Sequence, residues 1–285
     1  MEIKLYSTAH MTAAKVLYPS KINQTWCETQ WTDDEINECK SYEFMNFCAN
    51  PSIDNFPLKL SSELFTNREE YKILDEILSK NNKIKSFLSV GCGFGLTELG
   101  LAKKYPEIQF LAIDNAPYVE CLNKIAKELS INNINFKMYD LRNGNIGIFD
   151  LVYSMSVIYC IPQKYLESYF DILNSSAHDE STIVVGCTSN LTPSSYLRIL
   201  TRLLLIALGL MTSSTSKLLE KQTGWLRSVR DVERLISSVR FEIKETHYLY
   251  HISKIRLINR ISKNIYPLVN RGYLFVLKRQ IKRQE

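Results

Sequence analysis

The sequence contains no C-x-x-C pair, although it has seven cysteines. Paired cysteines are typical of zinc sites, and an even, regularly spaced set is typical of a disulfide framework in a small secreted domain. The seven are instead an odd and scattered set: Cys27, Cys39, Cys48, Cys92, Cys121, Cys160 and Cys187. The pattern predicts no metal site and favours reduced thiols in a cytoplasmic protein.

No apolar run is long enough to span a membrane. The most apolar stretch, Leu197 to Met211, has 15 residues and two arginines near its start, whereas a spanning helix needs about twenty apolar residues. The beginning of the chain also lacks the charged start and unbroken apolar run of a secretory signal. We therefore expect neither a transmembrane segment nor a secretory leader.

Charge is ordinary in amount but uneven in distribution. The chain is 23% charged and 45% apolar with a net charge of +5, which is typical of a soluble globular enzyme. Beyond His251, however, the chain has nine lysines and arginines but a single acid, Glu285. Such a tail is typical of a solvated surface, which is the simpler interpretation, or of a segment that meets an anionic substrate, a nucleic acid or a membrane surface.

Apolar strands and amphipathic helices alternate five times between about residue 66 and Cys187, with short links and no internal repeat. This alternation predicts a parallel sheet with helices on both faces. A further helix begins near Ser228, and two more strands follow it, which makes a seven-stranded α/β sheet. The predicted strands are 86–90, 108–113, 135–139, 149–155, 182–187, 241–248 and 273–278, and the helices between the first five span 96–105, 117–129 and 163–173.

A glycine-rich loop, Gly91 to Gly95, follows the first predicted strand. Glycines at alternate positions permit a tight turn and leave no Cβ in the way of a ligand, and the next helix presents free N–H groups to that ligand. Asp114 and Asp140 end the next two strands, where one carboxylate can accept ribose hydroxyls and the other an adenine amine. The pattern predicts a site for an adenosine-containing ligand at the carboxyl ends of the strands.

The loop is neither a dinucleotide nor a triphosphate motif. The third glycine comes one place earlier than in G-x-G-x-x-G, and no Gly-Lys-Ser/Thr follows. The loop instead resembles the first motif of the class I S-adenosylmethionine (SAM)-dependent methyltransferases. The matching segments are Leu88–Gly95, Leu111–Asn115 with the ribose acid Asp114, Asp140–Leu141 with the adenine acid, Phe149–Pro162 for the fourth-strand motif and, more loosely, Gly224–Asp231 at the last crossover helix.

The resemblance covers residues 66–190 well and 224–278 loosely. It implies a Rossmann-like, mostly parallel sheet with an antiparallel last strand, SAM as cofactor and a small-molecule acceptor. The cofactor-binding residues that it implies are Ser89, Gly91, Cys92, Gly93, Gly95, Asp114, Asn115, Asp140, Leu141, Ser154 and Met155. Ser154 and Met155 are expected to bracket the cofactor near the transfer point, although core packing explains Met155 equally well.

Two positions depart from the family pattern. The family usually carries an acid two residues before the first glycine, which helps to hold the methionine part of the cofactor, and this chain has Ser89 there. Many relatives also carry a histidine in the fourth-strand motif, where this chain has Tyr159-Cys160. The first change predicts either weaker cofactor binding or a compensating group, and the second leaves the catalytic base open.

The segments outside the repeated pattern are expected to surround the site. Residues 1–60 predict an N-terminal cap of short helices and loops, and residues 61–285 the methyltransferase domain. Insertions at 190–224, with the apolar helix 197–211, and at 249–270 stand where the family places substrate-covering additions. A lid with a basic wall, a core element, a homodimer interface and shallow membrane docking are alternative interpretations.

Methyl transfer from a sulfonium is an in-line displacement, so the protein mainly aligns the reacting groups. A base is needed only where the acceptor must lose a proton. His251 is the candidate base because it follows the sixth strand at the active-site rim, and Tyr159 is its competitor. His178 is discounted because it precedes the fifth strand, on the side away from the cofactor.

Rival functions remain open at this point. A nucleic-acid methyltransferase would fit the basic tail, but the chain lacks the Asn/Asp-Pro-Pro-Tyr element and the Pro-Cys nucleophile of such enzymes. A nicotinamide-dependent oxidoreductase would use a related fold. A non-catalytic, degenerate member of the family would fit the serine at position 89.

Overall fold

The computed structural model describes residues 3–4, 69–114, 119–120, 122–144, 146–158, 161, 165–187, 209, 225–226, 229–239, 241–249 and 272–279. Nearly all of the predicted cap and of the two insertions lies outside these ranges, so the division into a cap and a main domain stays a prediction. The described part of the first 60 residues is a two-residue strand, β1 (Ile3–Lys4), which pairs antiparallel with β7 (Trp225–Leu226).

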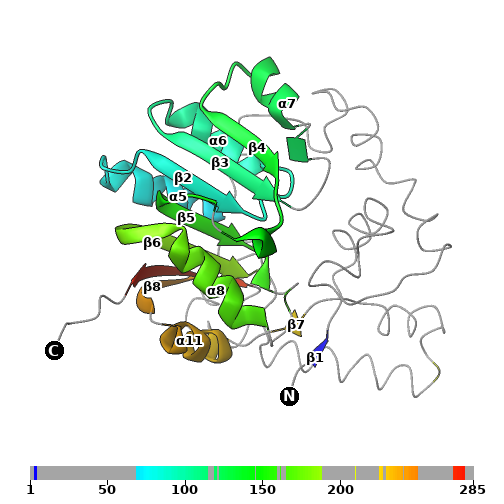
Figure 1. Ribbon diagram of the computed structural model, residues 1–285, viewed down its shortest axis with the longest axis vertical. Coiled ribbons are helices and arrows are strands. Elements are labelled where there is room, and N and C mark those ends of the chain that lie inside the picture. Colours follow the sequence, from blue (N-terminus) through cyan, green and yellow to red (C-terminus); the bar gives the residue numbers. More distant parts are fainter. Residues whose placement is uncertain are drawn as a thin grey trace.

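A seven-stranded sheet forms the centre of the molecule, in the order β4-β3-β2-β5-β6-β9-β8 (Figure 1). β2 to β6 are parallel, and β9 is inserted antiparallel between β6 and β8. The predicted fold class is therefore confirmed, including the antiparallel last strand. The strands are β2 (Ser86–Val90), β3 (Gln109–Asp114), β4 (Ile134–Met138), β5 (Phe149–Met155), β6 (Ala177–Cys187), β8 (Phe241–Leu249) and β9 (Gly272–Arg279).

Helices cover both faces of this sheet (Figure 1). α5 (Glu69–Lys80), α6 (Leu96–Lys104) and α7 (Leu122–Glu128) bury apolar side chains in one core, and α8 (Leu166–Ser175) and α11 (Val229–Ser238) bury theirs in the other. Neighbouring strand residues supply both cores, as a strand buried on two faces requires. Within the described ranges, no helix has the length and apolarity needed to cross a bilayer.

The start of β6 is the largest difference from the predicted strands. We predicted a strand from Thr182, with His178 in the preceding loop, whereas β6 begins at Ala177. Phe149 pairs with Ala177 while Leu151 pairs with Thr182, so the register shifts and the residues between them bulge out of the ladder. These residues are polar and irregularly paired, so no apolar alternation marks them as a strand.

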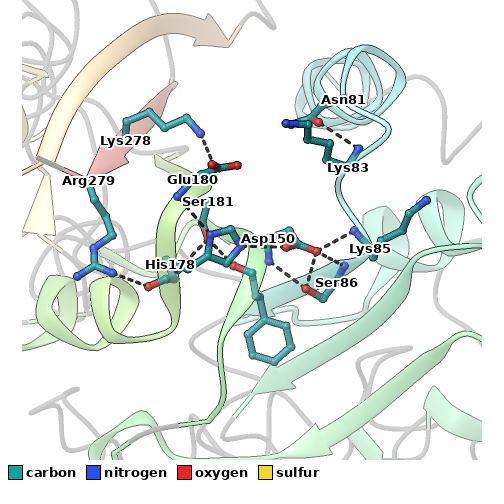
Figure 2. Close-up of polar contacts among 12 residues, drawn as sticks. Asn81, Lys83, Lys85, Ser86, Asp150, His178, Glu180, Ser181, Lys278 and Arg279 are labelled. Atoms are coloured by element: carbon teal, nitrogen blue, oxygen red, sulfur yellow. Dashed lines mark hydrogen bonds and ion pairs between the residues drawn. The ribbon is translucent and has the colours of Figure 1, made fainter. Parts of the chain in front are cut away.

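The bulge belongs to a polar cluster at the amino-terminal edge of the sheet (Figure 2). Asp150 Oδ2 accepts hydrogen bonds of 2.8 Å from the backbone N–H of Lys85, the N–H of Ser86 and the Ser86 hydroxyl, and Oδ1 lies 2.9 Å from Nε2 of His178. Burial by itself raises the pKa of Asp150, but the bonds from His178, Lys85 and Ser86 outweigh it and lower that pKa to about 2. The carboxylate thus ties the starts of β2, β5 and β6 together.

Replacing this carboxylate is expected to remove a pH-dependent part of the stability. Because its pKa is lower in the folded chain than its ordinary 3.8, it stabilises the fold above that value and the contribution is lost as the pH falls towards 2. Asp150→Asn should lower the free energy of unfolding by roughly 2 kcal/mol at pH 7. Urea unfolding at pH 7 and pH 3 measures this.

The exposed Asp171→Asn on α8 is the matched control and should leave the free energy of unfolding within about 0.5 kcal/mol of the wild type. Asp150→Asn should also flatten the fall in stability between pH 5 and pH 3. Equal stability of the two variants at pH 7 would contradict the assigned role of Asp150.

Candidate functional site

The predicted ligand-binding groups come together at the carboxyl edge of the sheet. From β2 the chain builds β3 and β4 on one side and then returns to place β5 on the other side of β2. The connections therefore diverge between the carboxyl ends of β2 and β5, which is where open α/β sheets bind their ligands. The glycine loop, Asp114 and Asp140 all follow strands that end at this edge.

Two glycines of the loop are required by close packing. Gly91 and Gly95 have φ values of +72° and +63°. A Cβ on Gly91 would lie 2.2 Å from Cγ2 of Val157, and one on Gly95 would lie 2.3 Å from the ring of Phe136. The loop is thus pressed against the segment after β5 on one side and against β4 on the other.

Gly93 differs from its two neighbours because it borders open space. Its φ is +55°, and no heavy atom of the described residues lies within 4 Å of the place where a Cβ would be. Its backbone N–H donates a 3.0 Å hydrogen bond to Oδ2 of Asp114 at the end of β3. Here bare backbone and a fixed carboxylate stand side by side.

Backbone hydrogen bonds hold this arrangement in place. The N–H groups of Gly91 and Cys92 donate to the Ile113 carbonyl at 2.8 and 3.1 Å, so the loop closes over the end of β3. The Tyr139 N–H donates to the Asp114 carbonyl at 2.8 Å, which brings the start of the 3₁₀ helix η3 (Leu141–Asn143) to the same place. Asp140, part-exposed between β4 and η3, therefore lies at the rim of the site.

Leu141 and Ser154 contribute to packing at this edge. The Leu141 side chain is buried in the core beneath α8. Ser154 is fully buried, and its hydroxyl donates to the Val90 carbonyl at 3.0 Å and accepts from the Tyr169 hydroxyl at 2.5 Å. The Ser154 hydroxyl therefore braces β2, β5 and α8, and the expected contact of Ser154 with a cofactor stays a prediction.

Met155, the last residue of β5, remains partly exposed. A Cβ on Gly186 of the neighbouring strand would lie 2.4 Å from the Met155 sulfur, so the side chain occupies space that only a glycine provides. The residue packs on the core while remaining half-buried. Its packing on the core is observed, and its contact with a ligand stays a prediction.

A buried acid that the sequence reasoning missed lies beneath the glycine loop. The Ser89 hydroxyl donates a 2.6 Å hydrogen bond to Oε1 of Glu98 in the first turn of α6. Both residues are almost wholly buried, with exposures of 1% and 3%. The signal was present as a serine at the usual acid position and an acid early in the next helix, but no spacing rule joins the two.

Cys92 sits between the acids of the site. Burial, and then the charges of Asp114 and Glu98, raise the pKa of the Cys92 thiol well above its ordinary value. The thiol therefore stays protonated at neutral pH, which excludes it as a nucleophile there.

Three predicted site residues, Asn115, Tyr159 and His251, lie outside the described residues. His251 follows the end of β8 by two positions in the sequence, and β8 ends at the same edge as the parallel strands because β9 is antiparallel to both β6 and β8. In the part of the chain that the structure describes, no group of three His, Cys, Asp or Glu side chains could hold a metal ion.

No family model matches the sequence, and no curated protein matches it. Solved structures do match. Magnesium protoporphyrin IX methyltransferase (ChlM) from Synechocystis PCC 6803, with bound S-adenosylhomocysteine (SAH), has a TM-score of 0.53 at 12% identity over 96% of this chain and 100% of its own. The mitomycin 7-O-methyltransferase MmcR has a TM-score of 0.54 at 11% identity, over 96% and 69%.

The N-methyltransferase NodS from Bradyrhizobium japonicum WM9, also with SAH, has a TM-score of 0.50 at 14% identity, over 82% of this chain and 95% of its own. At such identities the likeness concerns the fold. This chain has the Rossmann-like fold of the class I methyltransferases, as its sequence predicts.

The middle and the last glycine of the loop should respond differently to an added methyl group. Gly93→Ala should lower the free energy of unfolding by about 1 kcal/mol, because an alanine is unfavourable in the left-handed backbone conformation. Gly95→Ala has the same backbone cost, and its methyl group also collides with the buried Phe136 ring, so the free energy of unfolding should fall by about 2 to 4 kcal/mol. Urea unfolding of the two variants measures the difference, and equal losses would contradict the packing described for Gly95.

Proposed function

We propose that the protein is a SAM-dependent methyltransferase that acts on a small-molecule acceptor. The observation that carries the proposal is the hydrogen bond between Gly93 N–H and Asp114 beside open space at the switch point of the sheet. It combines a backbone that a ligand can approach closely with a carboxylate held in one orientation. This is the arrangement that an adenosine-containing ligand needs.

Each described residue then has a defined part in binding. Asp114 accepts the ribose hydroxyls, Asp140 at the rim accepts from the adenine amine, and the loop backbone from Gly91 to Gly95 lies along the ligand. Met155 borders the ligand at the end of β5. When bound, SAM would supply a methyl group activated by a sulfonium.

Catalysis itself requires little from the chain beyond alignment. Positioning of the two reactants can supply several kcal/mol of the barrier reduction. If the acceptor is a hydroxyl or phenol, a base must take its proton. His251 remains the proposed base and Tyr159 its competitor.

A small-molecule acceptor is favoured by the structures that share the fold. They are a magnesium protoporphyrin IX methyltransferase, a mitomycin 7-O-methyltransferase and an N-methyltransferase, so the fold serves different acceptors. The insertions at 190–224 and 249–270 are the proposed source of acceptor specificity. A cytoplasmic location and a homodimer through helix 197–211 belong to the same proposal.

Binding of the cofactor tests the first half of the proposal. By calorimetry, SAH and SAM should bind the folded wild type, while NADH should not. Asp114→Asn should weaken SAH binding about tenfold to a hundredfold, because it removes a charged acceptor and keeps an amide oxygen for the Gly93 N–H. Asp171→Asn on α8 is the control, and absence of SAH and SAM binding to folded wild type would overturn the assignment.

Transfer of a labelled methyl group tests the second half. With methyl-tritiated SAM, label should enter a low-molecular-weight extract and not RNA or DNA. His251→Ala or Tyr159→Phe should lower transfer without changing SAH affinity. Label in nucleic acid, with binding that weakens steeply as salt rises, would instead support the nucleic-acid alternative.

A further inference from the structure

The chain turns sharply where it leaves β5, at residues 156–158. Ser156 has a φ of +59°, a left-handed conformation that is uncommon outside glycine, and its N–H donates a 2.9 Å hydrogen bond to the Gly186 carbonyl of β6. Ile158, two positions further on, is 1% exposed and belongs to the core beneath α8. Val157 is therefore held between two residues whose places are fixed by other elements.

Val157 fills the notch that Gly91 leaves in the glycine loop. The place of a Cβ on Gly91 lies 2.2 Å from Cγ2 of Val157, and 3.6 and 3.9 Å from its Cβ and Cγ1, so the Cγ2 methyl group is the part that enters the notch. The Gly91 N–H donates to the Ile113 carbonyl at 2.8 Å. The carbonyl of the preceding residue, Val90, accepts from the Ser154 hydroxyl at 3.0 Å. The first turn of the loop is thus held from β3, from β5 and from the segment after β5.

The loop is packed at both ends, and the bond to Asp114 lies between them. At the far end, the place of a Cβ on Gly95 is occupied by the ring of Phe136 from β4. Gly93, between the two packed glycines, donates its N–H to Asp114. A ligand that lies along bare backbone binds more tightly when that backbone is already in place, because less conformational freedom is lost on binding. The packing at Gly91 therefore affects affinity through the loop backbone.

We propose that Val157 is a positioning residue of the cofactor site, which holds the first turn of the glycine loop in the conformation that the cofactor binds. It acts through Gly91 and is not itself a binding residue. The inference rests on the proposed function, because it assumes that SAM occupies the site. Since Tyr159 follows Val157 by two positions in the sequence, the same contact also fixes the loop relative to the start of the segment that leads to this candidate residue.

The competing explanation is that Val157 contributes only to the core. Val239→Ala is the matched control, because Val239 is also a half-buried valine packed on the same core, but it lies between α11 and β8. β8 runs parallel to β6, so it starts at the amino-terminal edge, away from the loop. By calorimetry, Val157→Ala should raise the dissociation constant of SAH about three- to tenfold, and Val239→Ala less than about twofold. Urea unfolding should show similar losses of stability in both variants.

Two larger variants test the shape of the contact at equal volume. Val157→Ile keeps the Cγ2 methyl group that enters the notch, so it should bind SAH within about twofold of the wild type. Val157→Leu introduces an isomer of the same size whose γ carbon carries two methyl groups. This branch is too bulky for a notch that holds one methyl group, so Val157→Leu should weaken SAH binding about as much as Val157→Ala. A general need for apolar volume at position 157 would not separate the two isomers.

Hydrogen exchange of the ligand-free protein, followed by mass spectrometry, reports on the loop directly. The amides of residues 91–95 should exchange faster in Val157→Ala and Val157→Leu than in the wild type, Val157→Ile or Val239→Ala. A side chain that touched the ligand without supporting the loop would leave this exchange unchanged. Circular dichroism of every variant checks that the fold is intact.

The outcomes are distinguishable. If folded wild type binds neither SAH nor SAM, the proposed function fails, and the inference fails with it. If wild type binds SAH and Val157→Ala binds it equally well, or if Val239→Ala weakens it as much, the assignment of Val157 is overturned while the proposed function stands. Unchanged exchange of residues 91–95 in a variant that binds SAH weakly also overturns the assignment. Should Val157→Ala not fold, the comparison of Val157→Ile with Val157→Leu decides, and equal SAH affinity of these two overturns it.

Discussion

The hydrogen bond from the Gly93 N–H to Asp114 is the contact on which the candidate site depends. It joins the loop after β2 to the end of β3, so two segments that are distant in sequence become one rigid surface. Gly91 and Gly95 on either side permit the required backbone, and Val157 and Phe136 occupy the space that their missing side chains leave. Among the three glycines, Gly93 is the one whose Cβ position meets no described atom.

The two edges of the sheet serve different purposes. At the amino-terminal edge, the Asp150 carboxylate is hydrogen-bonded to His178, Ser86 and the backbone of Lys85. These bonds stabilise the starts of three strands. At the carboxyl edge, left-handed glycines and the buried acid Glu98 lie at the candidate site. Buried ionisable groups are typical of functional sites that the rest of the fold must support.

Most of the fold could be predicted because its strands are short apolar runs bounded by glycine, proline and acids. β2 and β5 have the predicted bounds, and the other strands of the parallel core except β6 differ by one residue at either end. The early start of β6 was not predicted, because a bulge of polar residues shows no apolar alternation. Motif position alone could not show that the Ser154 hydroxyl bonds to the Val90 carbonyl and the Tyr169 hydroxyl.

By itself the sequence determined the alternation of strands and helices, the glycine loop and the acids at two strand ends, since all three are encoded in residues close together along the chain. Only the tertiary structure decided that Glu98 meets Ser89 and that Ser154 is closed to solvent. Those contacts arise between the strand, the loop and the helices packed on it, and their distances depend on side-chain packing that no local pattern records.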